Sequence, residues 1–112
     1  MPNRNKQRGY ELERETVLFW REKNAEVQRV FGSGAHSHAG EEFDGDVKLG
    51  PYTIEAKRKK SGFKFLYDAL EQGEYGTDML VIRQDRSRRL YVLEEETLLD
   101  LMRKAGLLST PI

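Results

Sequence analysis

The sequence contains no cysteine, which excludes disulfide bonds, thiolate zinc sites and cysteine nucleophiles. It also lacks an apolar run long enough to cross a membrane and an N-terminal apolar segment typical of a secretory signal. Because both are absent, we expect an intracellular, cytoplasmic location. The small size would also suit a protein encoded by a phage genome.

Net charge is absent too, since 19 basic residues balance 19 acidic ones. The charges are nevertheless segregated: residues 57–64 hold five basic side chains and no acid, and residues 83–89 hold four arginines and one aspartate. Segregated basic patches favour a polyanion such as nucleic acid as partner. A basic loop can also be simply solvated, so phosphate contact is one of two interpretations. The candidates are Arg58, Lys59, Lys60, Lys64, Arg86, Arg88 and Arg89.

The length of 112 residues fits one domain, residues 1–112, with a modest core. Residues 1–8 are polar and basic, and we expect a flexible arm there. Apolar periodicity predicts helices over residues 9–24, 63–74 and 94–105, and strands over 25–31, 45–49, 52–58, 78–83 and 90–93. Strand 78–83 is almost wholly apolar, which is typical of burial on both faces. The order αβββαββα predicts a mixed α/β fold, with a small mixed sheet flanked by helices.

The stretch DGDVKLGPYTIEAKRKK, residues 44–60, predicts a β-hairpin with an acidic residue on each strand. A tight turn at residues 50–51 pairs Leu49 with Tyr52 and sets a register in which Asp46 lies opposite Glu55. Directly opposed residues have Cβ atoms about 4.5–5.5 Å apart. Two carboxylates that close imply a cation between them or a proton on one of them.

Lys57 follows Glu55 at a spacing of two, so both belong to one strand face, opposite the apolar face of Tyr52, Ile54 and Ala56. Two carboxylates beside a lysine can supply oxygen ligands for Mg²⁺ and a positive group near a phosphodiester under attack. From these residues alone, a structural ion pair on a strand and a metal site are equally good interpretations.

Two further segments are open to more than one interpretation. Glu13 lies at the edge of a helical stripe with Val17 and Trp20, so it is either a boundary acid or one directed at something beneath the helix. The glycine-rich residues 32–45 predict either a mobile connection or a loop that offers backbone N–H groups to phosphate. His36 and His38 could hold a transition metal together with Asp44, or contact substrate or nothing.

Asp46, followed on the next strand by Glu55-Ala56-Lys57, resembles the PD-(D/E)xK nuclease signature, with Gly45 where that motif often has proline. The first helix, with Arg8-Gly9 and then Leu12-Glu13-Arg14-Glu15, is similar to that of archaeal-type and phage-encoded Holliday-junction resolvases. Arg29 and the loop Gly32-Ser33-Gly34 continue the similarity. The resemblance covers roughly the first sixty residues and extends loosely over an αβββαβ core.

The resemblance implies a restriction-endonuclease-like fold and a Mg²⁺-dependent DNA endonuclease, with Mn²⁺ as a substitute. It implies a homodimer that resolves four-way junctions by paired nicks, with no membrane partner and no organic cofactor. Another PD-(D/E)xK nuclease, acting on branched, flap or mismatched DNA, is an alternative. A DNA-binding module without catalysis is an alternative of another class.

The resemblance also assigns roles to residues. Asp46, Glu55 and the backbone carbonyl of Ala56 would bind one or two metal ions, and Glu13 would join them directly or through water. Lys57 would orient the attacking water and stabilise the developing phosphate charge. Contacts to the DNA backbone would come from Arg14, Arg29 and Ser33. Gln72 stands where many such nucleases carry a glutamine in the helix after the catalytic strand, although a solvated residue fits equally, and Tyr75 is similarly open.

Overall fold

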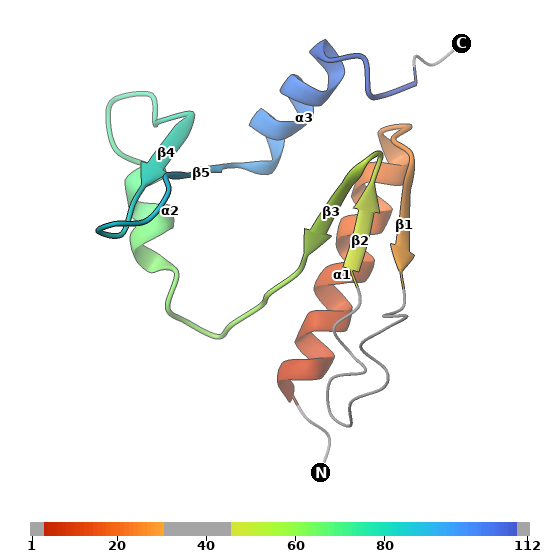
Figure 1. Cartoon of the computed structure of the whole chain (residues 1–112), viewed down its shortest axis with the longest axis horizontal. Coiled ribbons are helices and arrows are strands. Elements are labelled where there is room, and N and C mark those ends of the chain that lie inside the picture. Colours follow the sequence, from red (N-terminus) through yellow and green to blue (C-terminus); the bar gives the residue numbers. More distant parts are fainter. Residues whose placement is uncertain (1–3, 31–45, 110–112) are drawn as a thin grey trace. The chain divides into compact units, whose positions relative to one another are not determined.

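The computed structural model describes residues 4–30 and 46–109, with side chains for residues 10–30 and 47–109. Its elements, labelled in Figure 1, are α1 (Arg4–Glu22), β1 (Val27–Val30), β2 (Asp46–Leu49), β3 (Tyr52–Glu55), α2 (Lys64–Leu70), β4 (Met79–Ile82), β5 (Leu90–Leu93) and α3 (Glu95–Lys104). They form two compact units: a first unit, Met1–Lys59 with Gly106–Ile112, and a second unit, Lys60–Ala105.

The expected mixture of helices and strands is confirmed, while a mixed central sheet is not present among the described residues. The strands form an antiparallel sheet in the order β1-β2-β3 and a separate β4-β5 hairpin. None of the helices in the described ranges has the length and apolar content needed to span a membrane.

In the first unit, α1 packs along one face of the three-stranded sheet (Figure 1). Val17 and Trp20 of α1 are buried, as are Val47 and Leu49 of β2. These positions recur every three or four residues on the helix and every second residue on the strand. The apolar stripe predicted for the first helix is therefore confirmed.

Helix α1 begins at Arg4, so residues 4–8, expected to form an arm, are helical. They carry no apolar stripe, but lysine, glutamine and arginine favour helix on intrinsic propensity alone. The helix ends near Asn24, which has a φ of 64°, a left-handed value that asparagine tolerates. The N–H of Ala25 donates to the carbonyl of Trp20 at 3.0 Å, and the chain then reverses into β1.

The β2–β3 hairpin has the predicted register, with Leu49 opposite Tyr52 and Asp46 opposite Glu55. Gly50 has a φ of 59°, and the following proline fixes its own φ near −65°. A positive φ followed by a negative one is the sign pattern of a type II′ turn, which suits a two-residue hairpin loop. The Gly50 N–H also donates to the carbonyl of Glu26 at 2.7 Å, which ties the turn to the start of β1.

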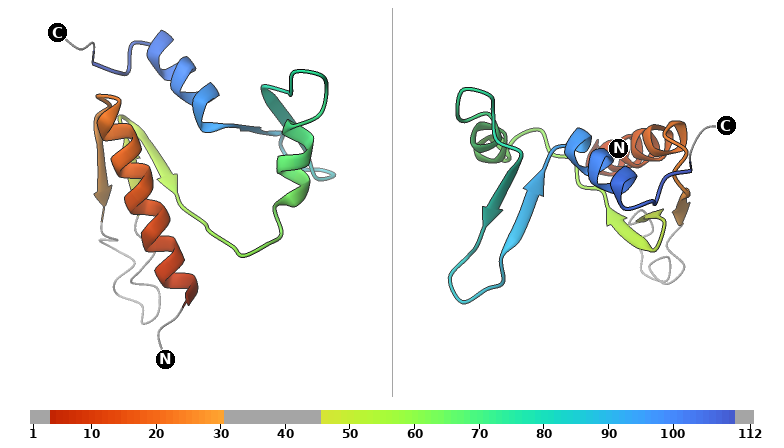
Figure 2. Two further views of the ribbon diagram at one scale, coloured as in Figure 1. Left: turned by 180° about the vertical axis from the view of Figure 1, so that it is seen from behind. Right: turned by 90° about the horizontal axis from the view of Figure 1, so that it is seen from above.

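In the second unit, α2 lies beside the β4–β5 hairpin (Figure 2). The prediction that strand 78–83 is buried on both faces is wrong, because Met79 and Val81 are 43% and 48% exposed. In the described chain β5 is the only strand that pairs with β4, and α2 covers only one face of this small hairpin. The apolar run therefore predicted the strand correctly, but it did not predict how much of the strand is exposed.

Helix α2 is shorter than predicted, because it ends at Leu70. Gly73 and Gly76 adopt φ values of 91° and 78°, which α-helical residues do not have. The N–H of Thr77 donates to the Leu70 carbonyl at 2.8 Å and closes the turn. The two glycines therefore mark a turn where the apolar periodicity had predicted further helix.

Helix α3 agrees closely with its prediction. Glu95 and Glu96 lie in its first turn, Arg103 and Lys104 in its last, and Gly106 follows with a φ of 78°. This charge distribution complements the helix dipole, and the glycine suits the left-handed position after the helix end.

Candidate metal and nucleic-acid site

The hairpin brings two acidic positions and one lysine to the end of the sheet. Asp46 and Glu55 are direct partners in the backbone register, although the side chain of Asp46 lies outside the described side chains. Glu55 Oε1 lies 3.2 Å from Lys57 Nζ, and the two side chains are 60% and 65% exposed. The prediction that Glu55 and Lys57 share a face is confirmed, even though β3 ends at Glu55. Ala56 lies half-buried between them.

This acid–base pair faces away from α1. Val47 is fully buried in the unit whose sheet packs on α1, and Ile54 is its direct partner across the hairpin. Because strand side chains alternate, Glu55 projects from the opposite face of the sheet. On that face Thr53 and Glu55 are exposed and Lys48 is partly exposed.

The same outward face carries Lys48, which the sequence interpretation did not single out. Lys48 is the direct partner of Thr53, and its Nζ donates to Thr53 Oγ1 at 3.2 Å. The signal that could have found it is the spacing of Lys48 from Asp46 on β2, which is the same acid-x-lysine spacing as that of Glu55 and Lys57. The register places Lys48 on the outward face, and its ion pair with Glu55 keeps Lys57 on the same side.

Glu13 lies on the other side of the sheet, between α1 and the strands. Its side chain is 3% exposed, and Arg29 donates to Glu13 Oε1 from Nε at 3.2 Å and from Nη2 at 3.0 Å. Arg29 is the direct partner of Val47, so it belongs to the α1 face, and its guanidinium lies 5.4 Å from the centre of the Tyr10 ring. The structure therefore brings Glu13 to Arg29 and does not bring it beside Glu55.

A three-carboxylate cluster is not formed by the described side chains. Among them, no group of three acidic or histidine residues could hold a metal ion. The predicted grouping of Glu13 with Asp46 and Glu55 stays a prediction, because the Asp46 carboxylate is not among the side chains described. The other loop residues predicted to contribute, Ser33, His36, His38, Asp44 and Gly45, lie outside the described residues.

Two of the basic residues predicted to contact phosphate form ion pairs with carboxylates of the protein. Arg58 Nη1 lies 2.6 Å from Glu11 Oε2, which ties the segment after β3 to α1. Lys64 Nζ donates to Asp68 Oδ2 at 2.6 Å, and this hydrogen bond together with the carboxylate charge raises the pKa of Lys64. Both side chains already have a counter-ion in the free protein. The other basic candidates among the described side chains are exposed: Arg14, Lys59, Lys60, Arg86, Arg88 and Arg89.

Gln72 and Tyr75 lie in the turn after α2. Gln72 is exposed, and its backbone carbonyl accepts a hydrogen bond from Thr77 Oγ1 at 3.0 Å. Tyr75 is 92% exposed. Gln72 therefore does not occupy the helical position that the resemblance gave it, since α2 ends two residues earlier.

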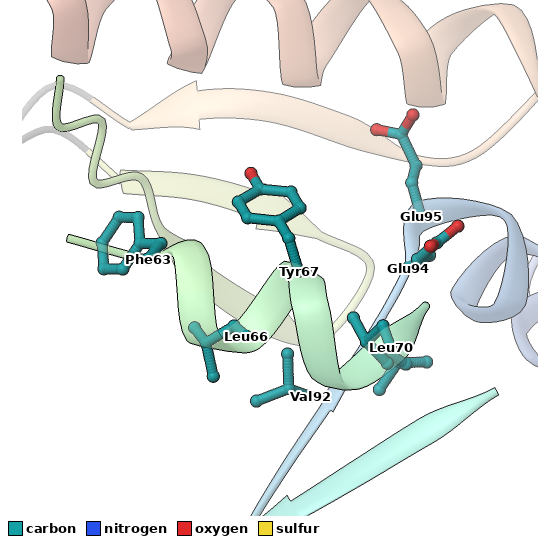
Figure 3. A pocket seen from close by; sticks show the side chains of 8 residues that line it. Phe63, Leu66, Tyr67, Leu70, Val92, Glu94 and Glu95 are labelled. Carbon is teal, nitrogen blue, oxygen red and sulfur yellow. The ribbon is translucent and has the colours of Figure 1, made fainter. Parts of the chain in front are cut away.

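The second unit contains an open apolar cavity of about 460 Å³ between α2 and β5 (Figure 3). Leu66, Leu70 and Val92 face one another there, with Glu94 and Glu95 at one end (Figure 3). Its lining contains no basic side chain, so it does not suit a phosphate ligand.

Comparisons of the chain with family models, with curated proteins and with solved structures find no match in any of the three. The family resemblance stays an expectation from the residues, and the functional proposal depends on the geometry of the hairpin site.

Proposed function

We propose that the protein is a Mg²⁺-dependent, structure-selective DNA endonuclease that resolves four-way junctions by paired nicks. The observation that carries the proposal is the hairpin register, which sets Asp46 opposite Glu55, with Lys57 Nζ 3.2 Å from Glu55 Oε1. Opposed acids at the open end of a sheet, beside a lysine, are the donor set that metal-dependent phosphodiester hydrolysis needs.

The donors fit a hard cation. Mg²⁺ is usually held by one or two carboxylates and keeps several waters, which are shared with substrate phosphates. Asp46 and Glu55, with the carbonyl of Ala56, would hold the ion. A bound Mg²⁺ would offset phosphate charge and favour ionisation of the attacking water. Mn²⁺ has similar ligand preferences and would substitute.

The other proposed site residues lie on two different faces of the sheet and would have different roles. Lys57 would stabilise the negative charge that develops on the phosphate, and Lys48 would contact a neighbouring phosphate from the same outward face. Glu13 would act as a positioning residue, because its buried carboxylate fixes the guanidinium of Arg29 at the edge of the sheet.

The proposal includes the restriction-endonuclease-like core with one mixed sheet, and a homodimer. The element order α1-β1-β2-β3-α2-β4 supports this core, because it is the αβββαβ order that the resemblance implies. A dimer supports paired nicks, because a four-way junction presents two symmetric strands and one chain carries one hairpin site.

A DNA-binding module without catalysis is a second candidate, favoured by a specific observation. Glu55 is paired with Lys57 and Glu13 with Arg29, so basic groups already neutralise two of the predicted acids. Such pairing would let a polyanion approach the sheet without a metal ion.

Cleavage of a set of labelled substrates separates these functions. A four-way junction, a flap, a mismatched duplex and a linear duplex are incubated with the wild type and with Asp46→Asn in Mg²⁺ or Mn²⁺. The proposal predicts paired nicks in the junction and none with the variant. Strong binding in EDTA, without nicks in either metal, would favour the binding module, and equal activity of the variant would exclude the hairpin site.

A further inference from the structure

The second unit carries another recess, whose lining combines apolar side chains with two arginines that the cavity in Figure 3 lacks. It has a volume of about 450 Å³, within the usual range of about 300–1,000 Å³ for ligand pockets. It lies between α2 and the turn that joins β4 to β5. Its lining is Phe65, Ile82, Arg83, Gln84, Ser87, Arg88 and Leu90.

One side chain that lines the recess is an exposed aromatic ring. Phe65 is 61% exposed although it belongs to the helix face beside the hairpin, and Leu90 is 48% exposed. An aromatic side chain left open in a recess is available for stacking on a planar ligand. Gln84 and Ser87 line the same recess and provide hydrogen-bonding groups beside that ring.

The turn above the recess is strongly basic. Residues 83–89 contain four arginines and one aspartate, and all of these side chains are exposed. The ion pairs found among the described residues include none of these four arginines. Unpaired guanidinium groups beside an open aromatic ring complement a phosphate next to a planar base.

The backbone of this turn is also unusual. Arg86 has a φ of 62°, a left-handed value that is uncommon for a side chain other than glycine, asparagine or aspartate. The N–H of Ser87 donates to the Gln84 carbonyl at 2.9 Å, which closes a tight turn around Arg86. Glycine would suit this position better, and the arginine instead adds an exposed positive charge at the tip of the turn.

We propose that this recess binds an unpaired nucleotide of single-stranded DNA. The base stacks on Phe65, and Arg83, Arg86 and Arg88 neutralise the flanking phosphates. Flaps and mismatches contain unpaired or unstacked bases, so the recess would recognise structure and not sequence. The choice of DNA as the ligand rests on the proposed function. The inference that the recess suits a base next to phosphates rests only on its aromatic and basic side chains.

The test measures binding of a labelled single-stranded oligonucleotide to the full chain in EDTA, over a series of salt concentrations. Phe65→Leu is expected to weaken binding by about 5- to 150-fold, because base stacking is lost, and to leave the salt dependence unchanged. Arg83→Ala/Arg88→Ala is expected to reduce the slope of log K against log salt by about 1.4, since each phosphate contact to a single strand contributes about 0.7. Phe65→Tyr keeps a ring and should bind like the wild type.

Two matched controls lie elsewhere in the second unit. Tyr67→Ala removes an exposed ring that lines the other cavity, and Arg103→Ala removes an exposed charge from α3. Both should bind like the wild type. Arg86→Gly removes one charge and places glycine, which tolerates a positive φ, at this position, so the fold should be kept. A reduction of about 0.7 in the slope of log K against log salt would then report the lost charge and not unfolding.

Wild-type affinity in Phe65→Leu, or an unchanged slope in Arg83→Ala/Arg88→Ala, would overturn the inference. So would tighter binding of an acidic peptide than of the oligonucleotide. If the wild type nicks junctions but does not bind single strands, the recess proposal fails and the nuclease proposal stands. If single strands bind as expected but no DNA is nicked, the nuclease proposal fails and the recess stands.

Discussion

Replacing Arg29 with methionine would leave the carboxylate of Glu13 without its guanidinium partner inside the first unit. The Glu13 side chain is 3% exposed, so water cannot take the place of the two hydrogen bonds that Arg29 donates. Breaking a buried ion pair in this way costs about 3–5 kcal/mol in the free energy of unfolding. With a urea m-value of roughly 2 kcal/mol/M, the unfolding midpoint should fall by about 2 M.

Changing the acidic partner of the pair should lower the free energy of unfolding by less. Glu13→Gln keeps an acceptor, and the guanidinium of Arg29, whose side chain is 26% exposed, retains access to water. We expect a loss of about 1.5–3 kcal/mol, the range for a hydrogen bond to a charged group. Glu13→Leu/Arg29→Met removes both charges and should recover most of the stability lost in Arg29→Met.

Urea unfolding followed by the fluorescence of the buried Trp20 measures all three variants, with Arg14→Met as the matched control on the exposed face of α1. The control should change stability by no more than about 0.5 kcal/mol. A loss below about 1 kcal/mol in Arg29→Met, or a larger loss in Glu13→Gln, would refute the buried-pair reasoning. It would also reopen a direct role for Glu13 in metal binding.

Three further predictions concern the hairpin and the core. Lys57→Met should change stability by less than about 1 kcal/mol in thermal unfolding, because the pair with Glu55 is exposed, yet reduce junction cleavage by about 100-fold or more. Gly50→Ala should lower stability by about 1 kcal/mol because of its positive φ, and Gly50→Asn by less; equal losses in urea unfolding would contradict the turn assignment. Trp20→Ala should cost about 3–5 kcal/mol, since Trp20 is 2% exposed, and a loss below about 1 kcal/mol would contradict its place in the core.

Local geometry in this chain could be predicted well from sequence. The register of Asp46 and Glu55 follows from counting outward from Gly50-Pro51, because an antiparallel hairpin leaves little freedom once its turn is set. The shared face of Glu55 and Lys57 follows from the strand period of two. The ends of α3 follow from capping and dipole preferences that act within one turn of helix.

Features that depend on tertiary partners were not predictable in the same way. The apolar strand 78–83 gave no sign that α2 would cover only one of its faces. Glu13 could be placed at the edge of an apolar stripe, but the sequence period of α1 does not say whether a metal ion or Arg29 meets it. The beginning of α1 at Arg4 was missed for a different reason, because no apolar periodicity marks it in the sequence.

The central claim is that the opposed acids of the β2–β3 hairpin hold a divalent cation. Addition of paramagnetic Mn²⁺ to isotopically labelled protein tests this directly, because amide NMR signals close to the bound ion broaden selectively. The account predicts broadening around residues 46, 47, 55 and 56 in the wild type, and its loss in Asp46→Asn and in Glu55→Gln. Selective broadening centred elsewhere, or unchanged broadening in both variants, would contradict it.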